Sequence, residues 1–182
     1  MEKRVLVPVA DGSEELETVA IVDVLRRAGA TVVVAGVKDV AISGSKGIKL
    51  IADAKVSDCL HELFDLIALP GGMPGAEHLR DSPELIALLK GQEGAGRLYA
   101  AICASPAIVL YPHGLLRDKR FTCHPNFVQG MPQGQVSAEG VVVQGNLVTS
   151  RGAGAAVEFA LALVELLYDD EKVQEVRRGM AI

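Results

Sequence analysis

Short runs of Val, Ile and Leu alternate along the chain with segments that have a helical pattern. The runs "RVLVPVA", "TVVVAGV", "DLIALPGG" and "RLYAAI" are apolar at nearly every position, which is typical of strands that are buried on both faces. Between them lie helical patterns such as "SEELETVAIVDVLRRAGA" and "SPELIALLKGQEGAG". This alternation predicts an α/β fold, a three-layer sandwich in which helices cover both faces of a mainly parallel sheet.

The rest of the chain extends the same architecture. The segment "IKLIADA" is a further candidate strand, and "EGVVVQGNLVTS" predicts a hairpin with a Gln-Gly-Asn turn. The segments "GAAVEFALALVELLYD" and "DEKVQEVRRGM" predict two closing helices. Because 182 residues suffice for one substantial core and no repeat or low-complexity linker interrupts them, we expect a single domain over residues 1–182.

Composition excludes several classes of function. A net charge of −5, 4% aromatic residues and no Trp disfavour nucleic-acid binding, and no apolar run is long enough for a membrane span. The chain enters a strand-like run at once, and its three scattered cysteines do not form a disulfide pattern. Neither Cys59 with His61 nor Cys123 with His124 has the spacing of a metal site. We therefore expect a cytoplasmic protein without metal, with a nuclear or organellar pool left open.

Glu17 is the unusual residue of the first predicted helix. At about 100° per residue, it falls at the centre of an apolar stripe formed by Ala20, Ile21, Val24, Leu25 and Ala28. Ser13 or Asp11 can cap this helix, and Glu14 and Glu15 suit its dipole. A carboxylate that faces the core is rare unless it is paired. Glu17 is either a helix-start residue at the edge of the core or an acid of raised pKa above the sheet.

Cys103 follows the strand "RLYAAI" and precedes "ASPA". A nucleophile at a sharp strand-to-helix turn needs small neighbours, and the first amides of the next helix are expected to lower its pKa. The alternative is a buried, inert thiol, which is our interpretation of Cys59. His124 lies in a loop before a proline and is the best available partner for Cys103. The loops "LPGGMPGAEHL" and "SRGAG" are interpreted as a turn and a helix start.

In combination these motifs are highly specific. The segments "GSEELETV", "DLIALPGG", "AAICASPA", "HP" and "TSRGAG…EFALALVELL" occur in the order of the ThiJ/PfpI superfamily, and the chain resembles the branch of the Parkinson-disease-associated protein deglycase from about residue 4 to 178. The resemblance implies a flavodoxin-like fold, a nucleophilic Cys103, a hydrogen bond from Glu17 to its sulfur, His124 beside it, and an oxyanion pocket formed by the amides of Gly72 and Ala104.

The resemblance also implies an assembly and an activity. The expected assembly is a homodimer formed through the first helix, with Arg26 and Arg27 available for contacts between subunits. The expected activity is that of a cofactor-free, glutathione-independent glyoxalase or deglycase, whose substrates are small dicarbonyls such as methylglyoxal, or glycated proteins. The alternative is a redox-sensing chaperone that acts through oxidation of the same cysteine.

The sequence departs from the family pattern at a few positions. Ala153 replaces a usual proline, and Gly44 and Ile51 stand where animal members have peripheral cysteines. Redox behaviour that depends on those thiols is therefore not implied here. No acid that would orient His124 is evident, which disfavours a protease-like triad.

Overall fold

A seven-stranded sheet runs through the computed structural model, which describes residues 2–182. The order of the strands is β5-β2-β1-β6-β7-β9-β8. Neighbouring strands pair in parallel except β8 and β9, which form an antiparallel hairpin. The strands are β1 (Arg4–Val9), β2 (Thr31–Gly36), β5 (Ala54–Lys55), β6 (Leu66–Leu69), β7 (Leu98–Ile102), β8 (Val141–Gln144) and β9 (Leu147–Ser150). The predicted α/β class and the mainly parallel sheet are confirmed.

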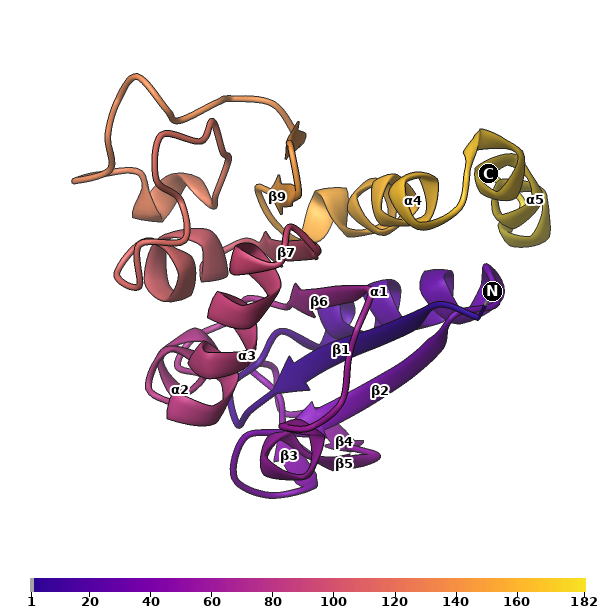
Figure 1. The fold of residues 1–182 in the computed structure, drawn as a ribbon, viewed down its shortest axis with the longest axis horizontal. Helices are drawn as coiled ribbons and strands as arrows, with labels where there is room; N and C mark the ends of the chain where they lie inside the picture. The colour runs from indigo at the N-terminus through magenta and orange to yellow at the C-terminus, as the bar shows by residue number, and fades with distance from the viewer. Residues whose placement is uncertain (1) are drawn as a thin grey trace.

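Helices cover both faces of this sheet (Figure 1). One face carries α1 (Glu15–Arg27), α4 (Ala156–Leu167) and α5 (Asp170–Met180). The other carries α2 (Gly75–Arg80), α3 (Pro83–Gly94) and the π-helical turn η2 (Pro106–Leu110). Because successive side chains of a strand point to opposite faces, Val5 and Val7 of β1 join the first core and Leu6 joins the second. Burial on both faces explains why the strands are almost wholly apolar.

Two local features differ from the sequence-based expectations. The candidate strand at 48–54 is divided between β4 (Lys49–Ile51), which pairs with β3 (Ala41–Ser43) in a separate hairpin, and the edge strand β5. The cap of α1 is Glu14, whose side chain accepts a hydrogen bond from the amide of Glu17. Ser13 and Asp11 accept hydrogen bonds from Ala10 and Ser43 instead. The first difference arises because β4 pairs with β3. The second arises because Asp11 is bonded to the hairpin at Ser43 and Ser13 is bonded to Ala10, just after β1.

The order in which the chain adds strands to the sheet switches sides at β1. From β1 the chain proceeds to β2 and β5 on one side and then crosses to β6 and β7 on the other. In such sheets the crevice outside the carboxyl ends of the strands, next to this switch, is the usual place for a ligand. The loops after β1, β6 and β7 all end there. Along residues 2–182, none of the helices has the length and apolar character needed to cross a bilayer.

Candidate active site

Cys103 occupies a strained turn directly after β7. Its φ of 65° places it in the left-handed region, which costs a residue other than glycine about 1–3 kcal/mol. The backbone is held on both sides, because its amide donates to Ser150 O (2.9 Å) and its carbonyl accepts from the amide of His124 (2.8 Å). Buried Ser105 donates to Pro70 O (2.5 Å) and ties the turn to the loop after β6. These contacts fix the sulfur at the edge of the sheet.

Glu17 reaches the same point from α1. Its side chain is fully buried, and Oε2 accepts a hydrogen bond from the amide of Gly71 (2.7 Å). Its Oε1 has no nitrogen or oxygen partner among residues 2–182. Burial raises the pKa of Glu17 to about 7, against the lowering effects of the Gly71 amide and of the Cys103 thiol. The carboxyl is therefore poised to gain or lose a proton near neutrality.

The Cys103 thiol does not have the lowered pKa expected from the sequence. Burial and the neighbouring Glu17 carboxylate raise its pKa to about 12, although the amides of Gly72 and Ala104 donate to the sulfur and act in the opposite direction. Burial contributes most to this rise, and the negative charge of Glu17 adds to it. When Glu17 holds the proton, that charge is absent and the carboxyl can donate to a thiolate. Cys103 and Glu17 therefore titrate as one coupled pair that shares a proton.

The close approach of Cys103 and Glu17 requires a glycine between them. A Cβ at Gly71 would lie 2.6 Å from Cys103 Cβ and 2.9 Å from Glu17 Oε2. Both distances are shorter than ordinary van der Waals contact, so a side chain here would push the acid and the thiol apart. The "LPGG" loop, interpreted from the sequence as a turn, is therefore a wall of the site.

His124 lies on the other side of the sulfur. A Cβ at Gly152 would lie 3.5 Å from His124 Cδ2 and 4.0 Å from Cys103 Sγ, so the ring and the thiol flank the same glycine. His124 Nδ1 accepts a hydrogen bond from the amide of Asn126 (3.2 Å), which assigns the proton of the neutral ring to Nε2. The partner of Nδ1 is therefore a backbone amide.

An open pocket of about 540 Å³ lies over these residues. Its lining adds residues that the sequence analysis did not place in the site, namely Glu14, Lys46, Pro125 and the segment 151–155. Glu14 was interpreted as a helix-dipole residue and "SRGAG" as a helix start. Lys46 comes from the β3–β4 hairpin, whose fold against α1 has no signal in the local pattern. For the segment 151–155, the arginine and the glycines of "SRGAG" were the sequence feature that could have indicated a place in the site.

The other two thiols are unlike Cys103. Cys59 and Cys123 are buried, with 1% and 3% of their surface exposed, whereas Cys103 is partly exposed. Burial raises the pKa of Cys59, and it raises that of Cys123 to about 11; because it also raises the pKa of Cys103, exposure and not pKa distinguishes Cys103. The part of the chain that the structure describes contains no group of three or more His, Cys, Asp or Glu side chains placed to hold a metal ion.

The fold and the site together define a class of protein. It is an α/β sandwich in which a cysteine at a strained strand-to-helix turn faces a buried acid. Comparison with known families matches residues 3–166 to the DJ-1/PfpI family. The chain belongs to this family.

Individual relatives agree with this assignment. The chain is 47% identical to protein DJ-1 homolog B of Arabidopsis thaliana over 98% of its own length, but it spans only 41% of that longer protein. It is 36% identical to the glutathione-independent glyoxalase DJR-1.2 of Caenorhabditis elegans, over 98% of this chain and 95% of the relative. The solved structure of oxidized DJ-1 from Toxoplasma gondii superposes with a TM-score of 0.96 at 46% identity, covering 98% of both chains. The flavodoxin-like fold is thereby confirmed.

Proposed function

We propose that this protein is a glutathione-independent glyoxalase that converts methylglyoxal and glyoxal to lactate and glycolate, with a related deglycase activity on early glycation adducts. The observation that carries the proposal is the coupled pair, in which a fully buried carboxyl with a pKa near 7 lies against a partly exposed thiol. The glyoxalase named among the relatives of this chain supports the same reaction class.

In the first step Cys103 attacks the aldehyde carbon. The pair supplies a thiolate when Glu17 holds the shared proton, and the new C–S bond gives a hemithioacetal after the aldehyde oxygen is protonated. The amides of Gly72 and Ala104, which point at the sulfur, are placed to stabilise the oxyanion before that protonation. The oxygen takes its proton from Glu17, which leaves Glu17 as a carboxylate for the next step.

In the second step Glu17 acts as the base. It removes the proton from the former aldehyde carbon, and the electrons form the double bond of an enediol. His124, through its Nε2–H, polarises the neighbouring ketone oxygen. Glu17 then returns the proton to the second carbon while the hydroxyl proton of the first carbon passes to the former ketone oxygen, which leaves a lactyl thioester on Cys103. Water hydrolyses the thioester, so that methylglyoxal and one water give lactic acid and the free thiol.

A product assay tests this function. The protein is incubated with methylglyoxal in the absence of glutathione, and the products are identified by NMR. We expect lactate to accumulate over many turnovers, and we expect Cys59→Ser to behave like the wild type because Cys59 is buried outside the pocket. Methylglyoxal that is consumed without lactate, or only stoichiometrically with protein, would refute the glyoxalase proposal.

A second candidate function is supported by Oε1 of Glu17, which has no nitrogen or oxygen partner in the described part of the chain. If two equivalents of peroxide oxidise the Cys103 thiolate to a sulfinate and release two waters, a protonated Glu17 can donate from this oxygen to the sulfinate. Such a product would be a stable oxidised state suited to a redox sensor. The catalytic assay separates the two functions, because a sensor needs no turnover.

A further inference from the structure

The carboxylate of Glu15 is buried but plays no part in the proposed chemistry. Only 3% of its surface is exposed, although it begins α1 two residues before Glu17. From the sequence, Glu15 was expected only to suit the helix dipole. A buried carboxylate needs hydrogen-bond donors, and its donors come from a single segment that is some thirty residues later in the chain.

Those donors form the tip of the β3–β4 hairpin. Oε1 of Glu15 accepts from the amides of Lys46 (2.6 Å) and Ile48 (3.1 Å), and Oε2 accepts from the hydroxyl of Ser45 (3.2 Å). We call this set of bonds the Glu15 clamp. Burial acts to raise the pKa of Glu15, but its own backbone amide together with these donors outweighs burial, and the pKa is lowered. The carboxylate is therefore charged at neutral pH and binds the hairpin tip with charge-assisted hydrogen bonds.

Gly44 shows how closely the clamp fits. A Cβ at this position would overlap the Glu15 carboxyl group. Two backbone bonds also tie the hairpin to the loop after β1, since Gly12 donates to Ser43 O (2.8 Å) and Ser45 donates to Ser13 O (2.9 Å). Beyond Ser45, it is the Glu15 clamp that binds the tip, residues 45–48, through the amides of Lys46 and Ile48.

The tip carries Lys46 into the lining of the Cys103 pocket. None of the ion pairs among residues 2–182 includes Lys46, so its charge is available to a ligand. A dicarbonyl substrate has a second carbonyl oxygen, and this oxygen gains negative charge in the enediol step. An ammonium group at the rim of the pocket is suited to bind it.

We propose that Glu15 is a positioning residue that holds the hairpin tip so that Lys46 binds a carbonyl oxygen of the substrate. The binding part rests on the proposed function, whereas the clamp itself does not. Two measurements therefore separate them: proteolysis of the tip, and kinetics on methylglyoxal.

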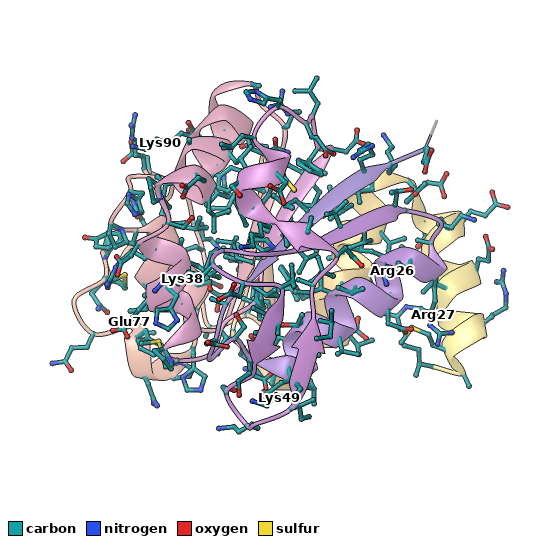
Figure 2. The ribbon with its side chains drawn as sticks, turned by 90° about the horizontal axis from the view of Figure 1, so that it is seen from below. Arg26, Arg27, Lys38, Lys49, Glu77 and Lys90 are labelled. Atoms are coloured by element: carbon teal, nitrogen blue, oxygen red, sulfur yellow. The ribbon has the colours of Figure 1, made fainter. Side chains whose placement is uncertain are left out.

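Trypsin reports on the clamp without any activity. The hairpin is accessible, and Figure 2 shows Lys49, its next lysine, at the outer edge of the molecule. In Glu15→Ala we expect cleavage after Lys46 to become about tenfold faster, because proteolysis follows the population of the locally open state. Glu15→Gln should stay near the wild type, since its amide oxygen can accept the same two backbone bonds. Glu84→Ala, which removes a first-turn acid from α3, is the matched control.

Cleavage after Lys90, within α3, reports global unfolding in the same digest. If Glu15→Ala is cleaved after Lys90 as quickly as after Lys46, the variant has unfolded globally and a second variant is needed. Gly44→Ala displaces the Glu15 carboxylate from the side of the loop. We expect it to show the same selective cleavage after Lys46. A tip that remains as resistant as the wild type in a folded Glu15→Ala or Gly44→Ala protein would overturn the clamp.

Kinetics test the contact with the substrate. Lys46→Ala and Glu15→Ala should each lower kcat/KM for methylglyoxal about tenfold, with a fall in kcat, because the bound oxygen gains negative charge during the reaction. The double variant should be no worse than either single variant, because both remove one interaction. Additive effects, or an unchanged kcat/KM, would overturn the role of Lys46. A wild-type protein that makes no lactate would refute the glyoxalase while the digest still decides the clamp.

Discussion

At the scale of the residue, the site depends on one proton that is shared by Glu17 and Cys103. Neither group alone has a pKa suited to both roles, because burial raises the pKa of each. Together they can exchange the proton, so that the acid is neutral when the sulfur is anionic. The buried environment thus supplies a nucleophile and a proton carrier within the same contact.

The raised pKa of Glu17 predicts a dependence of stability on pH. In the unfolded chain the carboxyl ionises near its ordinary value of 4.5, whereas in the folded protein it stays protonated until about pH 7. The stabilisation is complete below the unfolded pKa and is lost as the pH rises through the folded pKa, at a cost of about 3 kcal/mol. Denaturant unfolding at several pH values measures this effect. The free energy of unfolding of the wild type should fall relative to that of Glu17→Gln as the pH rises from 4 to 8. A difference that is constant from pH 4 to pH 8 would contradict the raised pKa.

Exposure predicts which thiol peroxide attacks. Burial raises the pKa of all three thiols, but Cys103 is partly exposed and contacts a proton acceptor, whereas Cys59 and Cys123 are buried. Mild peroxide should add two oxygens at Cys103 and leave the others largely unmodified. Peptide mapping by mass spectrometry measures the order of oxidation. If Cys123 reacted first, the reactive site would have been assigned to the wrong thiol.

At the scale of the element, three chain segments meet at Gly71: α1, the loop after β6 and the elbow after β7. Gly71→Ala should separate Glu17 from Cys103, because the new Cβ would lie 2.6 Å from Cys103 Cβ. We expect a loss of about 1–3 kcal/mol of stability and of most lactate formation. Gly91→Ala is the control, since that glycine lies in α3 with no atom within 4 Å of an added Cβ. Thermal unfolding and the product assay measure both effects, and a fully active Gly71→Ala would contradict the geometry.

Local patterns predicted the elements that contain the reactive groups. The apolar stripe of α1 located Glu17, and the small residues around Cys103 located the elbow, because both signals lie within one turn of the residue concerned. The long-range parts were not predictable in this way. Glu15 and Lys46 come together only because a hairpin folds back onto α1, and the raised pKa of Cys103 depends on tertiary burial.

At the scale of the whole molecule, an apolar surface remains uncovered on α1 and β4. Leu16, Val19 and Ile51 are 57%, 53% and 75% exposed, and the last two line one hollow. Arg26 and Arg27, suggested by the sequence for contacts between subunits, form ion pairs within the chain with Asp53 (3.1 Å) and Asp23 (2.6 Å). Figure 2 shows both arginines at the end of α1 beside α5. The apolar surface is the stronger basis for a dimer.

We predict that two chains associate through this surface as a homodimer. Light scattering at micromolar protein should give twice the 19.2 kDa mass of the chain. Val19→Asp should shift the protein toward the monomer, because it buries a charge in the contact. Leu63→Asp, at a residue that is 73% exposed in the loop before β6, should leave the mass unchanged. A monomeric wild type would refute the dimer.

The rates at which three variants form lactate test the coupled pair most directly. Cys103→Ser should abolish turnover, because a serine hydroxyl is scarcely ionised near pH 7. Glu17→Gln keeps the bond from Gly71 but cannot carry a proton, and it should lose about 10²-fold or more, whereas His124→Ala should lose about 10- to 100-fold. Glu17→Gln at the wild-type rate, with Cys103 still required, would contradict the proton transfer by Glu17. An active Cys103→Ser would contradict the nucleophile itself.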